Sequence, residues 1–198
     1  MGLPLNDYHL IDHPLQQLSL DILSDLADID IKQYPMGIDG CGLPAPTMPL
    51  LKLALTTARF AKPVGLPAKR AQAIYRLHKA IINEPLYIAG HGSVVSELNE
   101  VTNGSVLAKT GAEGIIIAAL PERGLGIAIK ISDGGERARS VALLAILDHL
   151  GTLSDEEKHK LQNHISPTII NSRGLAVGKI RPAASWLSNL AVNELNKN

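Results

Sequence analysis

Three short apolar runs that contain or adjoin glycine lie in the middle of the chain and limit the folds that it can adopt. They cover residues 105–109, 114–120 and 125–131, and isoleucine is their commonest residue. The sequence Pro-Glu-Arg-Gly at 121–124, between the last two runs, is typical of a hairpin turn. We therefore expect a small antiparallel sheet at the centre of the fold.

Apolar residues at helical spacing predict helices before and after this sheet. The expected helices cover residues 14–28, 48–59, 68–83, 93–102, 136–149, 154–164 and 184–195, and a last strand lies near 176–180. Asp12 is the expected N-cap of the first helix, and Ser154 with Glu157 forms a capping box. Segregated helices and strands indicate an α+β fold rather than βαβ winding, and the length indicates one domain over 1–198.

The composition excludes several classes of partner. Nineteen basic residues balance nineteen acidic ones, so no net positive field attracts nucleic acid or anionic lipid. Apolar runs stay far below the ~20 residues that a membrane span needs, and the first residues lack a signal peptide's basic region. We expect a cytoplasmic protein whose core is aliphatic, because aromatic residues make up only 3%.

Glycine and proline fill residues 34–47 and predict a long irregular loop with the single cysteine, Cys41, at its centre. A thiol in such a loop can be an exposed nucleophile or a metal ligand. A free cysteine can equally be a small buried apolar residue, and the local pattern favours that interpretation. A soft metal site usually holds two thiolates, so Cys41 would need histidine, carboxylate or another chain to complete it.

Lys109-Thr110-Gly111 ends the first expected strand and is the second candidate site. A lysine fixed on a strand can present its ammonium to a carboxylate or to a serine, and a buried lysine can act as a base. Serine acyl enzymes of the penicillin-binding group use Lys-Thr-Gly in this way. A surface lysine before a turn is the simpler alternative, and no serine of the chain stands at the Ser-x-x-Lys spacing.

Acidic residues in glycine-rich turns are further candidates. Asp39, Glu113 and Asp133 can each bind a substrate α-amino group, although such residues more often cap a turn. His91, between two glycines, can be a general base or a ligand, although histidines in turns are mostly solvated.

Six segments, taken in order and spacing, resemble the asparaginase II family, the Rhizobium-type L-asparaginases. The resemblance covers about residues 7–183, and it rests on residues 8–16, 37–46, 89–92, 109–114, 124–134 and 180–183. It implies a fold like those of serine β-lactamases and glutaminases. It also implies hydrolysis of asparagine to aspartate and ammonia, with a serine–lysine pair at the site and a zinc ion nearby.

The same resemblance implies roles for individual residues. Lys109 matches the active-site lysine that deprotonates or orients a serine, and Cys41 matches a zinc-ligand cysteine or substrate-site thiol. Asp39 and Gly40 match the loop that shapes the site. Substrate contacts are expected from Asp39, Gly40, Thr110, Gly111 and Glu113.

The chain departs from the family in ways that matter for activity. It holds neither the nucleophile's Ser-x-x-Lys segment nor the Cys-Ser-Gly-Lys-His segment, and Val95 stands where the family has another cysteine. We therefore expect an N-terminally truncated fold, the C-terminal portion of an asparaginase, that an N-terminal segment completes. A sheet without its first strands exposes an edge and an apolar face, which predicts a homodimer. The alternative is a non-catalytic remnant that binds an amino acid or a partner.

Overall fold

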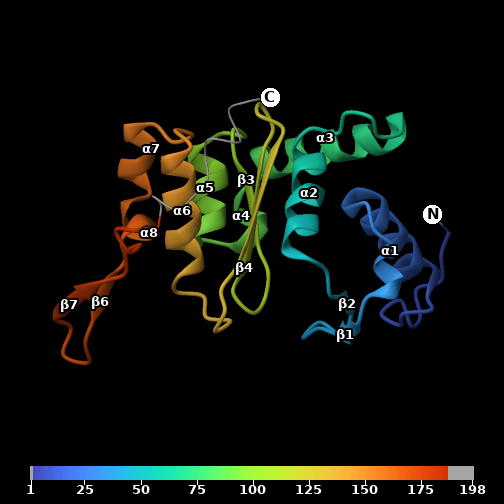
Figure 1. The fold of residues 1–198 in the computed structure, drawn as a ribbon, viewed down its shortest axis with the longest axis horizontal. Coiled ribbons are helices and arrows are strands. Elements are labelled where there is room, and N and C mark those ends of the chain that lie inside the picture. The colour runs from blue at the N-terminus through green and yellow to red at the C-terminus, as the bar shows by residue number, and fades with distance from the viewer. Residues whose placement is uncertain (1, 187–198) are drawn as a thin grey trace.

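The structure is a computed structural model that describes residues 2–186, and it has an α+β architecture (Figure 1). The helices are α1 (Pro14–Ala27), α2 (Leu50–Ala61), α3 (Ala68–Asn83), α4 (Leu86–Ala89), α5 (Val94–Val101), α6 (Arg139–His149), α7 (Asp155–Lys160) and α8 (Gln162–Ile165), with a 3-10 turn η1 (Ile31–Gln33). The strands are β1 (Met36–Ile38), β2 (Pro44–Pro46), β3 (Leu107–Thr110), β4 (Ile115–Leu120), β5 (Leu125–Lys130), β6 (Thr168–Ile170) and β7 (Ala176–Lys179).

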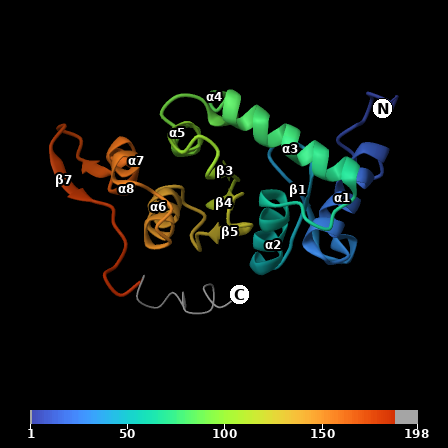
Figure 2. The ribbon, with the colours of Figure 1, turned by 90° about the horizontal axis from the view of Figure 1, so that it is seen from above.

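The central sheet has the antiparallel order β3-β4-β5, and its three strands confirm the three apolar runs. Lys109 pairs with Ile117, which in turn pairs with Ala128 on β5. The sheet separates two helical layers. Figure 2 shows α5 and α6 on one side, and α2 on the other side with α1 beyond it.

The main core lies between the sheet and the α5–α6 layer. Alternate strand residues such as Ala108, Ile116 and Ile127 point into it and meet Leu98 of α5 and Leu144 of α6. This alternation follows from the two-residue period of a strand. Within residues 2–186 the buried members of this cluster are all aliphatic, as the composition predicts.

The other face of the sheet receives α2 at Gly126. A Cβ at this position would overlap the carbonyl oxygen of Ala54 and the amide nitrogen of Ala58, so only glycine lets the helix lie directly on β5. Leu107 and Ala119 lie on the same face farther along the sheet, where they pack with Ala61 of α2.

Two expectations about the first fifty residues are wrong. Residues 34–47 are not wholly irregular, because β1 and β2 form a short hairpin. At its two ends, Asp39 N donates to Leu43 O and Thr47 N donates to Pro35 O, so neither bond requires a proline N–H. The N-cap of α1 is His13 rather than Asp12. The Nδ1 of His13 accepts from Leu15 N at 3.1 Å, and its Nε2 lies 3.1 Å from Pro4 O.

The remaining elements differ from expectation mainly at their ends. α6 begins at Arg139, three residues after the expected start. The Ser154–Glu157 capping box is confirmed, but the helix that follows divides at Leu161 into α7 and α8. Strand β7 is confirmed, and it pairs with β6, which the sequence analysis missed. The expected helix 184–195 lies largely outside the described residues. Within residues 2–186, no helix combines the length and apolar character that crossing a membrane requires.

Candidate functional site

Lys109 lies on β3, at an edge of the central sheet, and its side chain belongs to the face that α2 covers. Strand alternation puts it on the same side as Leu107 and opposite the core residue Ala108. Its Nζ is exposed and donates to Thr110 O at 2.8 Å. Behind it lies a cavity of about 280 Å³, bounded by α1, α2, α3, α4, β3 and β4. The cavity exists because α2 sits over β5, which leaves the β3 side of this face less covered.

Asn99 of α5 holds β3 in place next to Lys109 and was not among the residues predicted from the sequence. Its Oδ1 accepts from Ala108 N at 2.7 Å, and its Nδ2 donates to Ala108 O at 3.1 Å. Asn99 is fully buried. The amide group thus pairs with the free edge of β3 as a neighbouring strand would. The sequence gives no local signal for this role, because the partner of Asn99 lies nine residues farther along the chain.

Thr110 is the last residue of β3, and Gly111 and Glu113 follow in the turn between β3 and β4. Gly111 N donates to Ile115 O at 2.9 Å, which closes the turn. Glu113 adopts a left-handed backbone conformation with φ of 55°, and its side chain is exposed. Its carboxylate lies against Gly134, where a Cβ would come within 2.7 Å of Glu113 Oε2.

Arg139, at the start of α6, fixes this turn from the other side. Its Nη1 donates to Gly111 O at 3.0 Å, and its Nη2 lies 3.1 Å from Glu136 Oε1. Only 13% of the Arg139 side chain is exposed. This arginine ties the Lys-Thr-Gly segment to α6, and no local sequence pattern marks it, because its partner lies 28 residues away.

Asp133 belongs to the neighbouring turn after β5. Its Oδ1 accepts from Gly135 N at 2.8 Å, and its Oδ2 lies 3.4 Å from Arg137 Nη2. The Gly135 N–H, and after it the Arg137 guanidinium, lower the pKa of the Asp133 carboxyl below its ordinary value. The residue therefore caps its turn, which is the simpler of the two interpretations considered.

Asp39, Gly40 and Cys41 form the tip of the β1–β2 hairpin. Asp39 Oδ1 accepts from Cys41 N at 2.7 Å and from Leu43 N at 3.1 Å, so this carboxylate shapes the tip. Cys41 is exposed, and the burial that its local pattern favours is wrong. The turn that Asp39 shapes holds Cys41 at the tip of the hairpin, where the residue is exposed.

The described residues do not by themselves fit a zinc ion. Across residues 2–186, no three histidine, cysteine, aspartate or glutamate side chains lie close enough together to hold a metal. Cys41 has the Asp39 carboxylate nearby, but one oxygen of that carboxylate is already bonded to two backbone N–H groups. A structural zinc site uses four such ligands.

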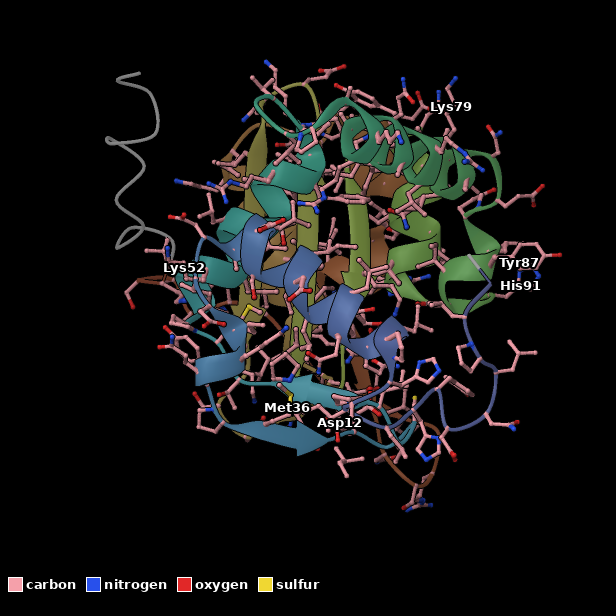
Figure 3. All side chains as sticks on the ribbon, turned by 90° about the vertical axis from the view of Figure 1, so that its right-hand side faces the viewer. Asp12, Met36, Lys52, Lys79, Tyr87 and His91 are labelled. Atoms are coloured by element: carbon pink, nitrogen blue, oxygen red, sulfur yellow. The ribbon has the colours of Figure 1, made fainter. Side chains whose placement is uncertain are left out.

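The candidate residues gather at one end of the molecule in two groups. Figure 1 shows the 111–114 turn and the β1–β2 hairpin at its lower end. Within the described part of the chain, no hydrogen bond or ion pair joins the two groups. Val95 is fully buried in the core below β3. His91 lies in an exposed turn, away from Met36 of β1 (Figure 3).

A family model described as L-asparaginase II matches residues 1–182, which is most of the chain. A search of curated protein sequences found no match. The matched range includes both groups of candidate residues and every strand of the structure.

Proposed function

The chain belongs to the L-asparaginase II family. From this premise we propose that it supplies most of the active site of an amidohydrolase. The proposed substrate is an amino-acid amide, asparagine above all. The reaction replaces the carboxamide C–N bond with a C–O bond from water and releases ammonia. The observation that carries the proposal is the family match over residues 1–182. The geometry adds that Lys109 stands on a sheet edge beside a cavity.

Lys109 is proposed to orient and stabilise the reacting groups. A lysine that acts as a base must be desolvated, whereas an ammonium that stabilises developing negative charge needs only to be fixed in direction. Lys109 is exposed here, and Asn99 and Arg139 fix the backbone on either side of it. The structure therefore supports the orienting role more than the role of base.

Substrate recognition is proposed to use both groups at the lower end of the molecule. An amino-acid amide carries an α-ammonium and an α-carboxylate, so its site needs an acceptor and donors. Glu113 and Asp39 are proposed to accept from the α-ammonium. Thr110 is proposed to donate to the substrate, while Gly40 and Gly111 leave room for its approach to the backbone.

The nucleophile is proposed to come from a polypeptide segment outside these 198 residues, because none of their serines stands at the Ser-x-x-Lys spacing. Such a segment can reach Lys109 from the cavity side. Cys41 enters the proposal as an exposed thiol at the rim of the site. A zinc ion on Cys41 stays a prediction that requires ligands from another segment or chain, and no step of the proposed reaction depends on it.

Ammonia release from asparagine tests the proposal. The chain is assayed alone and with a polypeptide that carries the family's Ser-x-x-Lys and Cys-Ser-Gly-Lys-His segments. We expect release only with the added segment, and a loss of roughly a hundredfold in kcat for Lys109→Ala.

Lys130→Ala is the matched control, because Lys130 ends β5 and its Nζ donates to the next carbonyl, of Ile131, as that of Lys109 does to Thr110. Lys130→Ala should keep the activity of the unchanged chain. Absence of ammonia in every combination, or equal losses for the two variants, would contradict the proposal.

A non-catalytic binding module is the second candidate. The missing Ser-x-x-Lys spacing favours it, since a family fold without a nucleophile can still hold an amino acid. Calorimetric titration with asparagine and aspartate distinguishes the two, because saturable binding without turnover in the presence of the added segment supports the binding module.

A further inference from the structure

The beginning of helix α5 is buried and lacks the partners that its backbone requires. The first N–H groups of a helix have no partner within the helix, and side chains, water or ligands satisfy them. Ser93 is the N-cap of α5, but its side chain forms no capping bond. Among residues 2–186, no group accepts from the N–H groups of Val94, Val95 or Ser96. Val95 and Ser96 are fully buried, so the surrounding solvent does not supply the missing acceptors.

Ser96 adds a hydroxyl group at the same place. It is the third residue of α5, the position from which a side chain reaches back to the start of its helix. The residue is fully buried, and its Oγ has no hydrogen-bond partner among the described residues. A buried hydroxyl without a partner is costly, and an ion, a water or a functional role usually explains it. The three N–H groups and this hydroxyl together form a set of donors suited to an anion.

Two glycines leave an approach to these donors. Gly90 and Gly92 precede the N-cap with φ of 78° and 74°, which glycine adopts without strain. A Cβ at either position would meet nothing within 4 Å, so neither glycine is packed against the body of the molecule. His91, between them, is exposed (Figure 3). A small ligand can therefore reach the beginning of α5 along this turn.

The donors lie beside Thr110, the last residue of β3. Asn99 bonds to Ala108, and Thr102, one turn farther along α5, bonds to the carbonyl two residues before Ala108. Helix α5 therefore runs antiparallel to β3 along the free edge of the strand. Ser96, one turn before Asn99, lies at the level of Thr110.

The Lys109 ammonium lies at the same edge of the sheet. Alternate residues of a strand direct their backbone groups to the same side, so the Thr110 carbonyl points away from β4, as the Ala108 carbonyl does. Lys109 Nζ donates to this Thr110 oxygen at 2.8 Å. The ammonium and the beginning of α5 thus face the same free edge of β3.

We propose that the beginning of α5 binds the α-carboxylate of the amino-acid amide, with Ser96 Oγ and the N–H groups of residues 94–96 as donors. This inference rests on the proposed function, because it assigns one part of the same site. A helix N-terminus offers a carboxylate several N–H groups, and the helix dipole favours its negative charge. The guanidinium of Arg139 is already bonded to Gly111 O and Glu136. With the α-carboxylate at α5, the side-chain carboxamide of the substrate extends along the free edge toward Lys109.

Titrations with asparagine and with asparaginamide, followed by NMR of the backbone amides, test the proposal. Asparaginamide keeps the α-ammonium and the side-chain amide but has a neutral carboxamide in place of the α-carboxylate. We expect asparagine to shift the amides of residues 94–96 saturably and asparaginamide to bind roughly a hundredfold more weakly.

Ser96→Ala should weaken asparagine binding roughly tenfold and leave asparaginamide binding unchanged. Its urea midpoint should not fall, because the hydroxyl that it removes has no partner among the described residues. Thr152→Val is the matched control, since Thr152 Oγ1 is also buried without a partner in residues 2–186 but lies beyond the end of α6. This variant should keep both affinities of the unchanged chain.

Sodium acetate separates this inference from the proposed function, because acetate carries only the carboxylate. At high concentration it should shift the amides of residues 94–96 saturably, whereas sodium chloride at the same ionic strength should not. Asparagine binding that shifts residues 109–113 but not 94–96, or that Ser96→Ala leaves unchanged, would overturn the inference and leave the proposed function standing. Acetate binding without any asparagine binding would contradict the proposed function, and with it the assignment of this anion site to the substrate.

Discussion

Asn99 shows how one side chain can take the place of a strand. An edge strand leaves backbone N–H and C=O groups unpaired, and a buried unpaired group is costly. Here the Asn99 amide satisfies both groups of Ala108 and so places the next residue, Lys109. The direction of the candidate catalytic lysine thus depends on a residue in a different element.

Replacing Asn99 with alanine should lower the free energy of unfolding by about 2–4 kcal/mol, because two buried backbone groups lose their partners. Urea unfolding measures the change. Asn83→Ala, at the exposed end of α3, is the control and should stay within about 0.5 kcal/mol of the unchanged chain. Equal effects of the two variants would show that the Asn99 amide does not hold β3.

Individual residues also mark the limit of sequence-based prediction. The pattern around Cys41 favoured burial, but Asp39 bonds to two backbone N–H groups and holds the thiol outside. Asn99 and Arg139 gave no local signal, because their partners lie nine and 28 residues away in the chain. Periodicity reports which face of an element is buried and says nothing of such distant bonds.

Among the elements, the three central strands and the long helices were predictable, whereas most helix ends and the short hairpins were not. Helix α3 has the expected bounds, because Pro67 and Pro85 flank it. The β1–β2 hairpin was not predicted, and only β7 of the β6–β7 hairpin was. Strands of three or four residues are too short for the alternation of apolar and polar residues to be detected.

The contact between α2 and α3 includes a buried histidine with a consequence for pH. His78 of α3 packs edge-on against the Phe60 ring, and its Nε2 lies 2.9 Å from Phe60 O. Burial lowers the pKa of His78 below its ordinary value of 6.5, although the Phe60 carbonyl acts in the opposite direction. Below pH 6.5 the unfolded chain therefore binds more protons at this site than the folded chain does.

We therefore expect the free energy of unfolding to fall as the pH drops below 6.5 toward the lowered pKa of His78. Above pH 6.5, the His78 contribution to this free energy should not change with pH. His78→Asn should reduce that slope in urea unfolding measured across the range. His91→Asn, in an exposed turn, is the control. Slopes that are the same for both variants and the unchanged chain would contradict the assignment to His78.

At the scale of the whole molecule, the α+β class and family follow from the order of elements and from the motifs, and both are confirmed. The likeness to serine β-lactamases, the single domain and the cytoplasmic location stay predictions. The placement of the site was predictable only in part. Lys109 lies near the end of a strand and Glu113 lies in the turn that follows, as expected. Asp39–Cys41 are far away in the sequence, so only the structure shows that they lie at the same end of the molecule.

An NMR titration of the chain with asparagine and aspartate tests whether this end of the molecule binds an amino-acid amide. We expect saturable shifts of backbone amides confined to residues 39–41, 94–96 and 109–113. Lys109→Ala should abolish these shifts, and Lys130→Ala should preserve them. The absence of saturable shifts, or shifts centred elsewhere on the molecule, would contradict it.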